Sequence, residues 1–83
     1  MTVRVLSDRM LELAGDCASE DADDLLRAML AYPAAVVDWR HCTHAHSAVV
    51  QVLFSARLEL VGPPAGEFLE KHIAPLLMRR ALD

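Results

Sequence analysis

Hydrophobic and polar positions in the first part of the chain follow the spacing of two short strands. Residues 3–6 are rich in β-branched side chains, and residues 7–9 have the composition of a turn. Residues 10–14 are mainly apolar and end at Gly15-Asp16, a turn-forming pair. These segments predict a hairpin at the edge of a sheet, with a second turn at Gly15.

A helix is predicted next, from Ser19 to about Tyr32. Ser is a favourable N-cap, and acidic side chains in the first turn oppose the positive end of the helix dipole. Apolar residues recur at helical spacing and are expected to face the core: Ala22, Leu25, Leu26 and Met29. Pro33 disfavours helical geometry in the residue before it, so the helix should end there.

The middle of the chain predicts a central strand over 34–39, because this run is apolar with little alternation. Trp39, at its end, is expected to fill the core. Residues 40–46 are polar and predict a loop, and residues 47–56 have the apolar spacing of a second helix.

The last part predicts a strand over 58–61, which ends at Gly62-Pro63-Pro64, and a helical segment over 66–82. Pro75 lacks a backbone donor, so a kink or a division into two short helices is expected there. The apolar residues available for the core in this segment are Phe68, Leu69, Ile73, Leu76 and Leu77.

This order of elements predicts an α/β fold. Strands that alternate with helices imply crossover connections, so the expected architecture is a four-stranded mixed sheet covered by about three helices. An antiparallel hairpin opens the sheet and parallel strands follow. A chain of 83 residues supports one modest core, so we interpret residues 1–83 as a single domain.

Composition narrows the class of protein. Hydrophobic residues make up 54% and charged residues 24%, which argues against disorder. The formal net charge of −4 disfavours a nucleic-acid partner, whose phosphates it would repel. No apolar run approaches the roughly 20 residues of a membrane span, and no secretory signal is evident. Two cysteines, Cys17 and Cys42, are expected to remain thiols in a reducing compartment, which predicts a cytoplasmic protein.

The chain resembles the STAS family, the sulfate transporter and anti-sigma factor antagonist domains. The family typically has a strand ending in Gly, a helix, a strand ending in Asp, and a loop that closes with Asp-Ser-Ser/Thr-Gly at the start of a helix. The segments that carry the resemblance are Leu11–Asp16, Leu30–Pro33, Ala35–Trp39, Cys42–Ser47, Gln51–Leu53 and Leu58–Pro63. The chain departs from the pattern around Ser47: His46 replaces the Asp, and Ala48 and Val49 replace the residues after the Ser.

In antagonist members of the family, the Ser at this place is phosphorylated by a kinase that is also the anti-sigma factor. The resemblance therefore implies a non-enzymatic, bacterial-type signalling protein with Ser47 as candidate phosphoacceptor. A phosphoryl group at a helix N-terminus meets free N–H groups and the positive dipole end. The alternative is that Ser47 is simply the N-cap of this helix.

Residues beside Ser47 are candidates for contact with a protein partner. Val50 and Phe54 lie three and seven residues after Ser47, on the same side of the predicted helix, although such residues are more often part of a core stripe. The full candidate surface is His46, Ala48, Val50, Gln51 and Phe54. The acidic run Asp16, Glu20, Asp21, Asp23 and Asp24 is expected to solvate the first helix, or to meet a basic partner surface.

Other chemistry has less support in the sequence. Cys42, His44 and His46 would share one side of an extended segment and could bind zinc or a similar metal, but the usual paired ligand spacing is absent. No phosphate-binding loop or nucleophile elbow is present, so no enzyme activity or cofactor is predicted. Three hypotheses remain: an anti-sigma factor antagonist, a STAS subunit of an ABC-type phospholipid-transport ATPase, and a small metal-binding protein.

Overall fold

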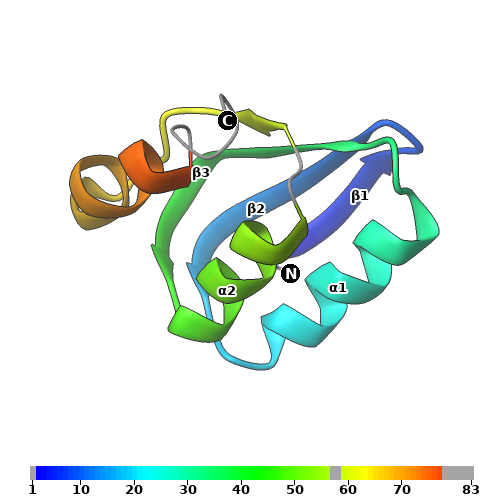
Figure 1. Cartoon of the computed structure of the whole chain (residues 1–83), viewed down its shortest axis with the longest axis horizontal. Coiled ribbons are helices and arrows are strands. Elements are labelled where there is room, and N and C mark those ends of the chain that lie inside the picture. The colour runs from blue at the N-terminus through cyan, green and yellow to red at the C-terminus, as the bar shows by residue number, and fades with distance from the viewer. Residues whose placement is uncertain (1, 57–58, 78–83) are drawn as a thin grey trace.

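A computed structural model describes residues 2–56 and 59–77 of the chain (Figure 1). The elements are β1 (Val3–Ser7), β2 (Met10–Cys17), α1 (Asp21–Ala31), β3 (Val36–Ala45), α2 (Ser47–Ala56), β4 (Leu60–Val61) and a π-helical turn, η1 (Leu69–Ile73). The strands form one sheet in the order β1-β2-β3-β4. β1 pairs with β2 antiparallel, and β2 with β3 and β3 with β4 are parallel. The predicted α/β fold with a mixed sheet is confirmed.

The two helices α1 and α2 lie side by side on one face of the sheet (Figure 1). The inner side chains of strands and helices form one hydrophobic cluster. Its fully buried members include Leu11 and Leu13 of β2, Val37 of β3, Leu25 of α1 and Val49 of α2. Alternate residues of a strand point to opposite faces, so Leu11 and Leu13 face the helices while Glu12 points to the other face. None of the helices in the described part of the chain is long and apolar enough to span a membrane.

The predicted turn at Gly15 is wrong, because β2 continues to Cys17. Gly15 has φ +74°, the left-handed region that glycine occupies without steric cost. The pairing with β3 shifts register between Gly15 and Asp16. The glycine therefore serves an irregularity inside the strand, where it bends the chain without ending the ladder.

The predicted loop over 40–46 is also wrong, because β3 extends to Ala45. Its second half pairs with the second half of β2, with His41 opposite Ala14 and Cys42 opposite Gly15. Most side chains in this half are exposed, and Cys42 alone is buried. The polar composition therefore reflects a solvated strand surface, which the sequence pattern does not distinguish from a loop.

Helix α1 begins one residue later than predicted, because Ser19 was expected as the N-cap. Glu20 occupies the N-cap position and makes no side-chain capping bond. Asp21 Oδ2 instead accepts a hydrogen bond of 2.7 Å from the Ala18 N–H, so an aspartate just inside the helix ties down the preceding loop. The predicted end is confirmed, because Tyr32 is the C-cap and its N–H donates to Ala28 O. Leu26 was expected in the core, but it is 45% exposed.

The last helical segment, 67–77, runs through Pro75 without dividing into two helices. The Ala74 N–H donates to Leu69 O, five residues back, so a widened turn immediately precedes the proline. Leu69 and Leu77 are buried as predicted, and Ile73 is partly buried against the core. The expectation is wrong for Phe68, 64% exposed, and Leu76, 50% exposed. Leu58 and residues 78–82 of the predicted elements lie outside the described residues.

Gly66 anchors this segment to β3. Its N–H donates to Cys42 O at 3.0 Å. A Cβ at this position would lie 1.9 Å from Thr43 O, so no larger residue fits here without a backbone shift. This close approach places the helical segment beside the part of β3 that extends beyond β4.

Candidate functional site

The candidate site lies at the edge of the sheet where β2 and β3 end, which we call the carboxyl edge. Because these strands are parallel, their last residues, Cys17 and Ala45, meet at this edge, and the chain enters α1 and α2 from it. The His46 N–H donates to Cys17 O at 2.8 Å and joins the two connections. Ligands of open α/β sheets usually bind outside the carboxyl ends of the strands. A shallow depression of about 500 Å³ lies here, lined by Asp16, Cys17, Ala18, Ser19, His44, Ala45 and His46.

Ser47 is exposed and is the first residue of α2. It is not the cap of the helix, because the His46 imidazole has that role: His46 Nδ1 accepts a hydrogen bond of 3.0 Å from the Ala48 N–H. The His46 carbonyl accepts the next two amides, of Val49 and Val50. The Ser47 hydroxyl makes no side-chain hydrogen bond within the described part of the chain, so it is available to a partner.

The candidate partner residues on α2 divide into two groups. His46 and Gln51 are exposed, and Val50 is half-buried. Ala48 and Phe54 pack against the hydrophobic core. The exposed strip of α2 is therefore Ser47, Gln51 and Ser55, at intervals of four residues, and Phe54 belongs mainly to the core stripe.

An apolar groove of about 470 Å³ runs between the two helices. Its lining comprises Leu26, Met29, Leu30, Pro33, Gln51, Val52 and Ser55, and we call it the α1/α2 groove. Leu30 is 73% exposed beside it. This groove was not predicted from the sequence, because the spacing of Leu26 indicated a core position. Leu26 and Leu30 are four residues apart and so lie on the same side of a helix. This spacing in the sequence could have predicted an apolar strip on the outer face of α1.

The proposed metal ligands do not come together. Cys42 is fully buried, whereas His44 is exposed, and the register of β3 with β2 shifts between these two residues. His46 Nδ1 is occupied by the Ala48 amide. Within the described residues, no group of three or more His, Cys, Asp or Glu side chains is arranged to hold a metal ion.

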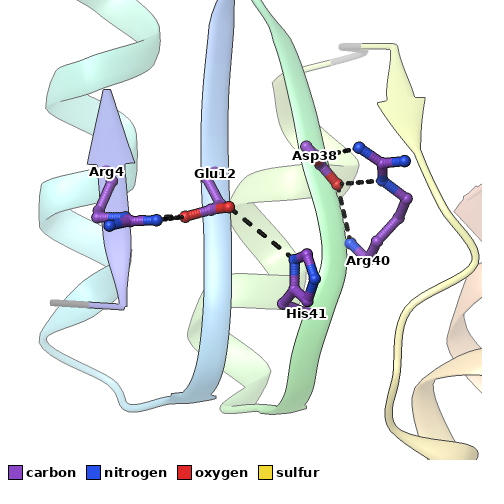
Figure 2. Close-up of polar contacts among 5 residues, drawn as sticks. All are labelled: Arg4, Glu12, Asp38, Arg40 and His41. Carbon is purple, nitrogen blue, oxygen red and sulfur yellow. Dashed lines mark hydrogen bonds and ion pairs between the residues drawn. The ribbon is translucent and has the colours of Figure 1, made fainter. Parts of the chain in front are cut away.

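The face of the sheet opposite the helices carries a row of charged side chains (Figure 2). Arg4 of β1 lies opposite Glu12 of β2 and forms an ion pair with its buried carboxylate. Arg4 Nε donates to Glu12 Oε1 at 2.8 Å. His41 of β3 approaches the other oxygen, with 4.0 Å between His41 Nδ1 and Glu12 Oε2. These contacts satisfy a carboxylate that would otherwise be costly to bury.

Asp38 and Arg40 form a second ion pair on the same face of the sheet (Figure 2). Asp38 is only 5% exposed. Its Oδ1 accepts from the Arg40 backbone N–H and from Nε, both at 3.0 Å, and its Oδ2 accepts from Nη2 at 2.9 Å. These hydrogen bonds to the Arg40 side chain and backbone lower the pKa of Asp38 from 3.8 to about 2. Asp38 is therefore a structural carboxylate.

Acid should remove this contribution to stability. The pKa of Asp38 is lower in the folded protein than in the unfolded chain, so the contribution is complete above about pH 4 and falls as the pH drops towards 2. We expect Asp38→Asn to flatten the decline in the free energy of unfolding between pH 4 and pH 2, as measured by urea denaturation. Arg40→Gln should flatten the decline in part, because it removes the hydrogen bonds of the Arg40 side chain and leaves that of the backbone N–H. A decline as steep in both variants as in the wild type would contradict the assignment.

No family model, curated protein or solved structure matches the chain. The proposal that follows therefore rests on the geometry of the carboxyl edge and of α2, together with the resemblance in sequence.

Proposed function

We propose that this chain is a non-enzymatic regulatory protein, similar to STAS anti-sigma factor antagonists. It binds a serine-kinase-like partner through the N-terminal end of α2, and the partner transfers a phosphoryl group to the Ser47 hydroxyl. The unmodified form binds the partner, and the phosphorylated form is released. The resemblance supplies this mechanism, and the exposed position of Ser47 at the start of α2 is compatible with it.

The observation that carries the proposal is the division of roles between His46 and Ser47. A serine at a helix N-terminus commonly caps the helix, and its hydroxyl is then engaged with a backbone amide. Here the imidazole of His46 accepts the Ala48 amide instead. The Ser47 hydroxyl is thus exposed at the positive end of the α2 dipole, where a phosphoryl group is stabilised.

The charge of α2 supports control by phosphorylation. No side chain between Ser47 and Ala56 carries a charge. A phosphoryl group would add about −1.5 to −2 charges to this surface. A partner that fits an uncharged helix would then have to bury a dianion, so binding should weaken.

The experiment is phosphoryl transfer in a defined mixture. The protein is incubated with ATP and each serine-kinase-like anti-sigma factor encoded in the same genome, and its intact mass is measured. We expect one phosphate on the wild type, none on Ser47→Ala, and one on Ser55→Ala, a matched control with an exposed serine on the same helix. Transfer to no variant, or transfer that survives Ser47→Ala, would overturn the proposal.

The α1/α2 groove favours a second candidate, a constitutive subunit of an ABC-type ATPase. Large exposed apolar side chains that gather on one surface mark protein-binding sites, and Leu26 and Leu30 at this groove are 45% and 73% exposed. Four of its lining residues are apolar residues of α1 and the turn after it: Leu26, Met29, Leu30 and Pro33. In that case the partner would co-purify with the chain, and Ser47→Asp would not release it, whereas Leu30→Asp would.

A further inference from the structure

Cys17 and Cys42 are in contact although 25 residues separate them in the chain. Their Sγ atoms lie 3.8 Å apart, between β2 and β3 near the carboxyl edge. Both are free thiols with no exposed surface. The proposed docking function does not use these two thiols. Among the described residues, they are two potential nucleophiles in direct contact.

The contact makes the two thiols chemically different. When Cys17 loses its proton, the Cys42 S–H donates a hydrogen bond to the thiolate, which lowers the pKa of Cys17. The same contact, together with burial, raises the pKa of Cys42. Cys42 Sγ also lies 3.3 Å from His44 O, to which its S–H can donate. Because the thiolate is the nucleophile, Cys17 is the member that reacts first.

A depression borders one side of the pair. Cys17 is among the residues that line the depression at the carboxyl edge, together with Asp16, Ser19, His44 and His46. Cys17 is fully buried, so its sulfur meets a small molecule from this depression only when the edge opens locally. Cys42 does not line the depression. A bulky reagent would need a larger opening of the sheet.

We propose that Cys17 and Cys42 are an oxidation site, at which a small peroxide converts the two thiols into an intramolecular disulfide. The Cys17 sulfur attacks one peroxide oxygen, the O–O bond breaks, and Cys17 becomes a sulfenic acid as the first water leaves. The Cys42 sulfur then attacks the Cys17 sulfur, the S–O bond breaks, and the second water leaves with the Cys42 proton. Two thiols and one hydrogen peroxide give one disulfide and two waters, so sulfur is oxidised and oxygen reduced.

The disulfide would act on the carboxyl edge through the backbone. The two sulfur atoms must approach from 3.8 Å to about 2 Å, which draws the ends of β2 and β3 together. Cys17 O holds the His46 amide, and Cys42 O holds the Gly66 amide. Closure therefore changes the segment that positions Ser47 and the anchor of the last helical segment, whatever partner binds there.

The test oxidises the reduced wild-type protein with hydrogen peroxide and counts thiols by alkylation after denaturation. We expect both thiols to disappear together, a monomer that has lost two hydrogen atoms in mass, and a peptide linking Cys17 to Cys42. Dithiothreitol should restore both thiols. Peptide mapping separates this product from oxidised methionine. Thiols that remain alkylatable, or disulfides found only between two chains, would overturn the proposal.

Single variants test the order of reaction. In Cys42→Ala, Cys17 should stop at the sulfenic acid, which dimedone traps. Each variant removes the contact that separates the two pKa values, so the comparison tests access to the depression. In Cys17→Ala, the remaining Cys42 does not line the depression and should react at least tenfold more slowly. Equal rates in the two variants would contradict the assignment of Cys17 as nucleophile. Circular dichroism establishes that each variant is folded, and the wild-type measurement decides the proposal without them.

Discussion

Replacement of Trp39 by alanine is expected to lower the free energy of unfolding by about 3–5 kcal/mol, the usual cost of removing a large buried aromatic side chain. Trp39 is 1% exposed and lies against the chain segment that follows β4. A Cβ on Gly62 would lie 2.3 Å from Trp39 Nε1, so the indole fills the space beside this glycine. A small depression next to Trp39 is lined by Pro63, Glu70, Ala74 and Pro75. The side chain therefore joins β3 to the last helical segment.

The matched control is Phe68→Ala in that helical segment. Sequence spacing assigned Phe68 to the core, but the side chain is 64% exposed, and its ring contact is with His72, at 5.0 Å between centroids. We expect a change within about 0.5 kcal/mol, as for most surface substitutions. Urea unfolding followed by circular dichroism suits both variants, because Trp39 is the single tryptophan. Equal destabilisation by the two substitutions would contradict the packing described for this segment.

The order and type of the elements were predictable because periodicity carries that information. The hairpin of β1 and β2, the helix that ends at Tyr32, and the helix that begins at Ser47 are all confirmed. When a helix lies between two neighbouring strands, the chain usually crosses over the sheet, and the two strands are then parallel. The boundaries were less predictable, since they depend on tertiary contacts.

Two errors share one physical cause, which is pairing between the second halves of β2 and β3. The pair Gly15-Asp16 is typical of a turn. However, hydrogen bonding to β3 continues β2 beyond Gly15. Residues 40–46 have the polarity of a loop, but hydrogen bonds to β2 extend β3 to Ala45. The second half of β3 is polar because its side chains are mostly exposed. Only Cys42 is buried there.

The candidate site was predictable in position and not in detail. Ser47 lies at the start of α2, as its place in the sequence indicated. That His46 would cap this helix was not foreseen, because histidine is not among the common capping residues. The contact between Cys17 and Cys42 depends on the extension of both strands, which composition concealed.

Binding of the proposed partner should weaken at least tenfold when a negative charge is placed at Ser47. Aspartate in the first turn of a helix stabilises the helix, so Ser47→Asp should fold as well as the wild type. Any loss of binding then reports on the docking surface itself. Ser7→Asp is the matched control, because Ser7 is exposed at the end of β1, which runs antiparallel to β2 and so ends away from the carboxyl edge.

The most direct measurement is the Kd of the purified partner for the wild type, Ser47→Asp and Ser7→Asp, determined by calorimetry. We predict a Kd at least tenfold higher for Ser47→Asp, about 1.4 kcal/mol of lost binding, and a value for Ser7→Asp close to that of the wild type. The same Kd for all three proteins would contradict a partner seated on the first turn of α2.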